Sequence, residues 1–117
     1  MEQLIIDTKN SYYEYVSRIP DSCQGIANLL REGNTDEALS VIINLVEGLT
    51  WLLSVEELMF ANHLVINSRI AEANEFLTDI NNALESGDFV TVADLFEYEI
   101  QPLFSSAIEW VFRSIKD

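Results

Sequence analysis

A regular repeat of apolar residues constrains the fold of this chain more than any other feature. Between positions 38 and 52, and again between 66 and 84, apolar side chains recur at alternating steps of three and four residues, which places them on one face of a helix. These residues are Ala38, Ile42, Leu45, Leu49 and Leu52, and then Ile66, Ile70, Ala73, Leu77, Ile80 and Leu84. No stretch keeps the period of two that a half-buried strand requires. The pattern predicts an all-α protein without strands.

Two glycines punctuate this helical pattern. Gly33 and Gly87 each end an apolar-periodic segment and are followed by Asn, Thr or Asp residues that favour the start of a new helix. Turns this short place consecutive helices side by side and antiparallel. A softer break lies between residues 60 and 68, where Asn and Ser residues occur. We therefore expect an antiparallel four-helix bundle, with helices over about 3–31, 35–60, 67–85 and 88–115.

Two prolines modify the expected helices. Pro20 lies inside the first helix and Pro102 inside the fourth, and each lacks the backbone N–H that a helix interior uses. We expect the first helix to be bent or broken near Pro20, because Pro20 followed by Asp21 and Ser22 also suits the start of a fresh helix. We expect the last helix to be kinked near Pro102.

Acidic residues dominate the charge of the chain. With 49% hydrophobic residues, positions 1–117 are expected to form a single acidic helical-bundle domain. The net charge is −14, and fifteen carboxylates between Glu32 and Phe112 are accompanied only by Arg69. Nucleic acids and anionic lipids both require clustered Lys and Arg, so we expect neither as a partner. The acidic surface either confers solubility alone or selects a basic protein partner.

Two further features bear on location. The first residues lack a cationic stretch followed by an apolar one, so we expect no secretory signal and assign the protein to the cytoplasm. The apolar region from 39 to 66 is interrupted by Glu47, Glu56, Glu57 and His63, which we take to exclude a membrane-spanning helix.

Residues that support catalysis or bind metals are scarce. His63 is the single histidine and Cys23 the single cysteine, which leaves too few ligands for the metal sites common in helical bundles. The sequence contains no phosphate-binding loop and no nucleophile elbow. We expect no cofactor, no metal and no enzyme activity, with His63 in an exposed loop and Cys23 buried as a small apolar residue.

One carboxylate falls on an apolar helix face. Steps of 100° per residue place Glu56 in line with Leu49 and Leu52, where an unpaired charge is costly. The chain reverses after Glu56 and brings Arg69 back toward it. We predict a structural ion pair between Glu56 and Arg69 at one end of the bundle.

The fourth expected helix carries the candidate partner-binding site. Its apolar arc is wider than two neighbouring helices need, and Tyr98 and Phe112 project away from its core face. Asp94 and Glu97 flank these aromatic residues as an acidic rim. In the alternative interpretation the helix lies centrally, and Pro102 rotates its C-terminal half so that Phe112 turns into the core.

Two segments resemble a known family, one from Ala83 to Pro102 and the other from Glu47 to Leu53. The most specific part is the run Ala93-Asp94-Leu95-Phe96-Glu97-Tyr98-Glu99, which precedes Pro102. The chain resembles a functionally uncharacterised family of small acidic helical proteins of Gram-positive bacteria. The resemblance covers about the C-terminal two thirds, implies a bacterial cytosolic protein and transfers no activity. A looser likeness is to flagellar export chaperones, which are antiparallel helical bundles of similar length.

These observations favour a cytosolic protein-interaction module, chaperone-like or adaptor-like, that offers an apolar, acid-rimmed groove to a helical or basic protein partner. A homodimer through the same aromatic surface is a further expectation. The alternative function is an acidic inhibitor, similar to an immunity protein or antitoxin, that blocks a basic partner electrostatically.

Overall fold

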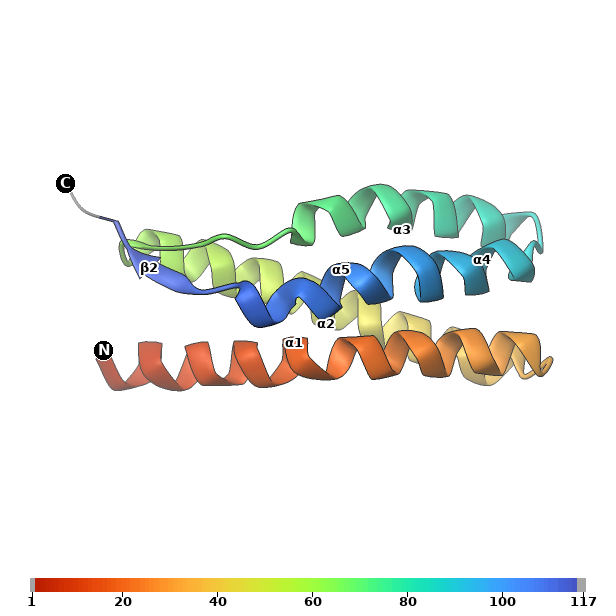
Figure 1. The fold of residues 1–117 in the computed structure, drawn as a ribbon, viewed down its shortest axis with the longest axis horizontal. Coiled ribbons are helices and arrows are strands. Elements are labelled where there is room, and N and C mark those ends of the chain that lie inside the picture. The colour runs from red at the N-terminus through yellow and green to blue at the C-terminus, as the bar shows by residue number, and fades with distance from the viewer. Residues whose placement is uncertain (1, 116–117) are drawn as a thin grey trace.

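The computed structural model describes residues 2–115, and most of them are helical. Figure 1 shows helices running along the long axis of a body whose Cα atoms extend over 50 × 22 × 21 Å. In chain order the elements are α1 (Glu2–Arg31), α2 (Thr35–Ala61), β1 (Leu64–Ile66), α3 (Ile70–Glu85), α4 (Phe89–Leu95), the π-helical turn η1 (Phe96–Ile100), α5 (Gln101–Ser105), the 3-10 turn η2 (Ser106–Glu109) and β2 (Phe112–Ser114). The helical class is confirmed, but the expectation that no strand would form is wrong.

Both glycine turns have the same backbone geometry. Gly33 and Gly87 lie in the left-handed region, at φ values of 81° and 72°, where an L side chain is strained. The amide of Asn34 donates to the carbonyl of Leu29, and the amide of Asp88 donates to Ala83 in the equivalent place. These bonds satisfy carbonyls at the ends of α1 and α3. The two positions predicted to be tight turns are therefore confirmed.

α1 continues through Pro20 as one helix, so the interpretation that Pro20 begins a separate helix is wrong. The bend remains a prediction. Pro20 removes one backbone bond, but buried side chains on both sides of it, including Val16, Ile19, Cys23 and Ile26, hold the helix in place. Packing on neighbouring elements therefore outweighs the local cost of the proline.

A π-helical turn precedes Pro102. In η1 the amide of Gln101 donates to the carbonyl of Phe96, five residues earlier instead of four. A proline ring in a regular helix collides with the carbonyl four residues before it, here that of Tyr98, and a wider turn relieves this collision. The sequence predicts a kink at this place, and the structure has a change of helix type.

The C-terminal segment differs from the expected helix. The expected helix reaches residue 115, but helical structure ends at Glu109 and the backbone of Trp110 is extended. β2 then pairs antiparallel with β1, with Leu64 opposite Ser114 and Ile66 opposite Phe112. Strands of three residues are too short to show a period of two, which explains why the sequence pattern did not reveal them.

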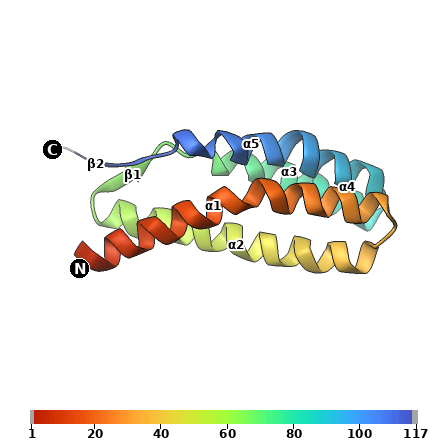
Figure 2. The ribbon, with the colours of Figure 1, turned by 60° about the horizontal axis from the view of Figure 1, so that its bottom comes forward.

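α1 is central to the packing. It packs against α2 and against α4, η1 and α5, while α3 packs against α4 and η1 (Figure 2). α2 and α3 make little close contact with each other. The largest fully buried side chains form one cluster that includes Tyr12, Ile19, Ile26, Leu52, Met59, Phe96, Ile100 and Phe104. One flank of α2 therefore lacks a neighbouring helix.

The contact between α1 and α2 gives a test with a built-in control. A Cβ placed on Gly48 would lie 1.6 Å from the hydroxyl oxygen of Tyr15, whereas a Cβ on Gly25 would have no neighbour within 4 Å. Gly25→Ala should stabilise the fold by about 0.5–1 kcal/mol, the usual gain within a helix. Gly48→Ala should gain less or destabilise the fold, because Tyr15 must leave its place against Trp51. Urea unfolding of both variants checks this, and equal gains would contradict the close approach.

Candidate interaction surface

The predicted ion pair between Glu56 and Arg69 is wrong. The guanidinium of Arg69 binds Glu72, with Nε 2.7 Å from Oε2 and Nη2 2.9 Å from Oε1. Glu56 instead accepts hydrogen bonds from the hydroxyls of Tyr12, at 2.6 Å, and Ser68, at 2.8 Å. The extended segment β1 carries Arg69 to the start of α3, where a carboxylate three residues away is the nearer partner.

The bond from Tyr12 to Glu56 is internal to the fold. Tyr12 is fully buried, and burial, followed by the hydrogen bond and the charge of Glu56, raises the pKa of its hydroxyl above the usual value. The hydroxyl therefore stays protonated and keeps donating. A half-buried carboxylate on α2 is thus satisfied by neutral donors from α1 and from the segment before α3.

Removal of this donor has a measurable cost. Tyr12→Phe should destabilise the fold by about 1.5–3 kcal/mol, the usual contribution of a hydrogen bond to a charged group. Ser68→Ala should cost less, because the Tyr12 bond to the same oxygen remains. Chemical denaturation checks both variants, and a neutral Tyr12→Phe would show that water replaces the hydroxyl at Glu56.

The four residues predicted to bind a partner do not form one surface. Phe112 lies in β2 and not on a helix, and it is buried with its ring 5.1 Å from that of Tyr12. Asp94 and Glu97 bind Arg31 of α1, at 3.1 Å and 2.9 Å, so they belong to an internal contact. Tyr98 is exposed, with 63% of its surface accessible, and so is Asp94 beside Arg31. The predicted aromatic surface with an acidic rim is therefore wrong, and the inward position of Phe112 follows from the end of the helix at Glu109 and the extended backbone that begins at Trp110.

The Arg31 contact changes the titration of Glu97. Arg31 first, and then Tyr98 and Gln24, lower the pKa of Glu97 to about 2. The amide of Gln24 donates to the same oxygen, Oε1, at 2.7 Å. These contacts connect α1 to η1 at the end of the molecule where the two glycine turns lie.

This contact predicts a loss of stability in acid. The folded-state pKa lies below the value of 4.5 for a free glutamate, so ionised Glu97 stabilises the fold above that pH. The contribution disappears as the pH falls from about 4.5 toward 2. Thermal unfolding between these values should be less pH-dependent in Glu97→Gln than in the unmodified chain. Glu99→Gln, which changes an exposed carboxylate two residues away, is the control and should retain the original slope.

A row of exposed apolar side chains lies on α2. A second line of residues repeats the three- and four-residue steps next to the buried line, and we call it the outer seam: Leu39, Ile43, Val46, Thr50, Leu53, Glu57 and Phe60. Ile43 and Phe60 are 58% and 63% exposed, and Val46 is 40% exposed. Leu39 and Leu53 are half-buried against the core. Sequence analysis missed the outer seam, although its spacing equals that of the core line.

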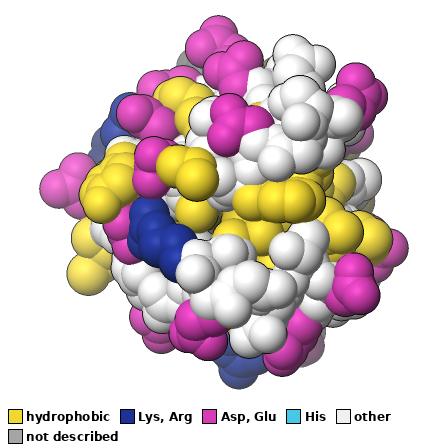
Figure 3. Space-filling view, turned by 90° about the vertical axis from the view of Figure 1, so that its right-hand side faces the viewer, with side chains coloured by type: hydrophobic (Ala, Val, Ile, Leu, Met, Phe, Trp, Pro, Cys, Tyr) yellow, Lys and Arg dark blue, Asp and Glu magenta, His cyan; other side chains and the backbone are white. Residues whose placement is uncertain are grey.

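The direction of the outer seam follows from helix geometry. Gly48 and Trp51 of α2 contact Tyr15 of α1, and they lie on one side of the buried line. Val46 and Leu53 lie on the other side, at 100° per residue, and so face away from α1. Since α3 does not pack closely on α2, the outer seam remains open. Figure 3, viewed from the glycine-turn end, shows hydrophobic side chains gathered in a band on that end of the molecule, with Asp and Glu side chains scattered over the rest of the face.

The apolar composition of α2 also bears on whether this helix could span a membrane. By length and composition alone α2 could cross a membrane, with a mean hydropathy of 1.8 over its most apolar window. The expectation that Glu47, Glu56 and Glu57 exclude such a helix is therefore wrong. One third of that window is buried in the fold, and a helix in the core of a soluble protein also meets these criteria.

All charged residues of α2 and α3 are acidic. α2 and α3 contain no Lys or Arg, and Arg69, which immediately precedes α3, is paired with Glu72. The carboxylates of these two helices are Asp36, Glu37, Glu47, Glu56, Glu57, Glu72, Glu75, Asp79 and Glu85. The outer seam is therefore an apolar line within an acidic field.

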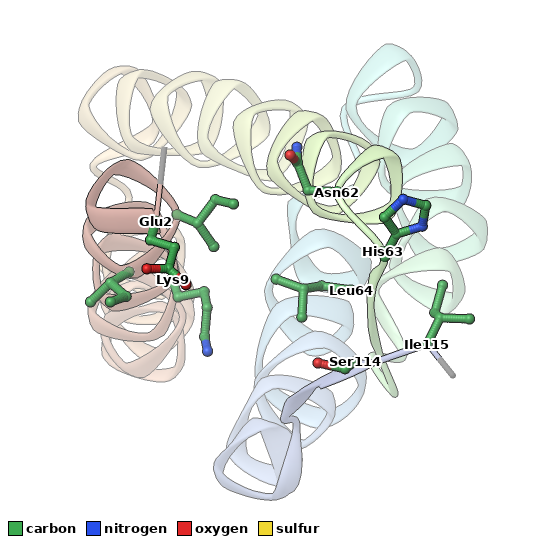
Figure 4. A pocket seen from close by; sticks show the side chains of 9 residues that line it. Glu2, Lys9, Asn62, His63, Leu64, Ser114 and Ile115 are labelled. Atoms are coloured by element: carbon green, nitrogen blue, oxygen red, sulfur yellow. The ribbon is translucent and has the colours of Figure 1, made fainter. Parts of the chain in front are cut away.

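Three of the hollows among the described residues bear on the choice of a binding site. An open one of about 620 Å³ lies between the start of α1 and the sheet, where Figure 4 shows Lys9 and His63 on different elements around it. A cleft of about 580 Å³ between α1 and the C-terminal segment is lined by uncharged residues, among them Tyr13 and Trp110. A recess of about 320 Å³ lies where the outer seam meets β1.

The residues considered for chemistry are dispersed. His63 is exposed in the turn before β1, and Cys23 is buried, which raises the pKa of its thiol to about 12. Both positions agree with the sequence-based expectation. Within residues 2–115, no three His, Cys, Asp or Glu side chains are grouped so as to hold a metal ion.

Comparison with known proteins gives one match. Residues 7–109 match a family model described as "Domain of unknown function (DUF8042)". No curated protein matches the chain, and no solved structure matches it. The match extends from α1 to η2 and agrees with the expected resemblance to a family without an assigned function.

Proposed function

We propose that this chain, which belongs to the family of domains of unknown function DUF8042, is a protein-interaction module that binds an apolar helix of its partner along the outer seam of α2. The observation that carries the proposal is the second apolar line on α2, beside the buried one. A helix with a single neighbouring face needs only one such line. Exposed side chains as large as Ile43 and Phe60 lower solubility unless another surface covers them.

The proposed domain organisation and location of this function are those expected from the sequence. The module acts as one acidic helical-bundle domain, chaperone-like or adaptor-like, in the bacterial cytoplasm and without catalysis. α1 and α2 run antiparallel, as do α3 and α4 (Figure 1), and the proposed partner lies on the side between α2 and α3, which make little close contact. Neither nucleic acid nor a membrane is the proposed partner, because −14 charges oppose phosphate surfaces.

An acidic inhibitor of a basic protein is the second candidate. The absence of Lys and Arg from α2 and α3 favours it. An inhibitor held by charge alone should lose affinity steeply as salt rises and should tolerate changes in apolar seam residues. The interaction module should depend on those apolar residues at any salt concentration.

Site-specific photo-cross-linking in the cytoplasm tests the proposed function. A benzophenone amino acid in place of Val46 should give a discrete adduct, and one in place of Ser40, exposed on another side of α2, should not. Ile43→Asp should abolish the Val46 adduct with little change in thermal stability, because the Ile43 side chain is mostly exposed. The same adducts from both positions would contradict a binding surface on the outer seam.

A further inference from the structure

The recess at the end of the outer seam carries two carboxylates on apolar walls. It has a volume of about 320 Å³ and is lined by Leu53, Glu56, Glu57, Phe60, Leu64, Val65 and Ile66. Four of these residues belong to α2 and three to β1. The recess therefore exists only because β1 leaves the end of α2 in an extended conformation, and it opens onto the outer seam through Leu53, Glu57 and Phe60.

The two carboxylates retain acceptor capacity. Oε2 of Glu56 accepts both hydroxyls, from Tyr12 and Ser68, and within residues 2–115 no hydrogen bond involves its Oε1. Glu57 is exposed and forms no ion pair with the described residues. Two adjacent carboxylates without a cation repel each other, and a positive group between them would lower the energy of both.

We propose that this recess binds a Lys or Arg side chain of the partner helix, so that the partner is a basic amphipathic helix and not a second copy of this chain. The aliphatic stem of Lys or Arg suits the walls at Leu53 and Leu64, while its charged head reaches Glu57 and Oε1 of Glu56. Phe60 adds an aromatic face for the cation. The inference rests on the proposed function, since the same outer seam holds the apolar side of the partner.

Electrostatic repulsion disfavours a second copy of this chain as the partner and favours a basic helix. Two copies of α2 placed seam to seam would bring Glu57 of both copies into one interface, with no Lys or Arg on either helix. Like charges in contact oppose that pairing. The outer seam runs from residue 39 to residue 60, a distance of about 32 Å at 1.5 Å per residue, so it accommodates a partner helix of about six turns.

Synthetic peptides of matched helical pattern test the inference with the intact chain. Each peptide carries Leu at the a and d positions of three heptads, and its flanking positions carry Lys, Gln or Glu. Fluorescence anisotropy should show the tightest binding for the Lys peptide, about tenfold weaker binding for the Gln peptide and the weakest for the Glu peptide. Ile43→Asp should weaken binding of the Lys and Gln peptides alike, because both use the apolar seam.

Two carboxylate variants locate the cation. Glu57→Gln should weaken the Lys peptide about tenfold and leave the Gln peptide unchanged, which isolates the charge pair. Glu47→Gln removes the same charge from another side of α2 and should change the affinity for the Lys peptide less than about twofold. Both variants alter exposed side chains, so circular dichroism should show an unchanged fold.

Each contrary result has a distinct meaning. Equal affinity for the Lys and Gln peptides would overturn the basic partner and leave the proposed function standing. Equal effects of Glu57→Gln and Glu47→Gln would overturn the recess as the binding place. If no peptide binds, and phosphatidylcholine vesicles bind in a manner that Ile43→Asp abolishes, the proposed function fails as well. Self-association lost in Ile43→Asp, measured by sedimentation, would make a second copy the occupant and overturn the inference.

Discussion

The rest of the structure depends on one buried side chain, that of Tyr12. Its hydroxyl donates to Glu56 of α2, and its ring packs edge to face against Phe112 of β2. The neighbouring hydroxyl of Tyr13 accepts the amide of Phe112, at 3.1 Å. The N-terminal half of α1 therefore fixes both α2 and the C-terminal strand. Because Tyr12 remains protonated, it satisfies the carboxylate without a second buried charge.

The positions of the few Lys and Arg residues determine which carboxylates of residues 2–115 are already paired within the chain and which are free to bind a partner. Arg18 pairs with Glu14, Arg31 with Asp94 and Glu97, and Arg69 with Glu72, so three of the six basic residues already have partners. The carboxylates around the outer seam have no such neighbour on α2 or α3. Ion pairs within the chain thus lie on α1, α4, η1 and the start of α3, whereas α2 has none among the described residues. This difference supports the proposal that the outer seam binds a positive partner.

The sequence pattern indicates the outer seam, but it does not indicate that this line, and not the other, is exposed. The outer seam from Leu39 to Phe60 has the same spacing as the core line, so the repeat alone indicates two apolar lines on one helix. Helical spacing does not say which line a neighbour covers. The prediction of Tyr98 and Phe112 assumes one regular helix to residue 115. The π turn and the extended backbone from Trp110 onward invalidate the angles on which that prediction rests.

The sequence by itself determined the helical class, the two glycine turns and the burial of Cys23, because each depends on local periodicity or on one residue type. Only the tertiary structure decided the pairing of β1 with β2, the partners of Glu56 and Arg69, and the continuity of α1 through Pro20. The strand pairing and the hydrogen bond to Glu56 join residues far apart in the chain. The continuity of α1 depends on whether packing with distant residues outweighs the local free-energy cost of Pro20. Tyr12 and Glu56 are 44 residues apart, and no local pattern records that their side chains meet.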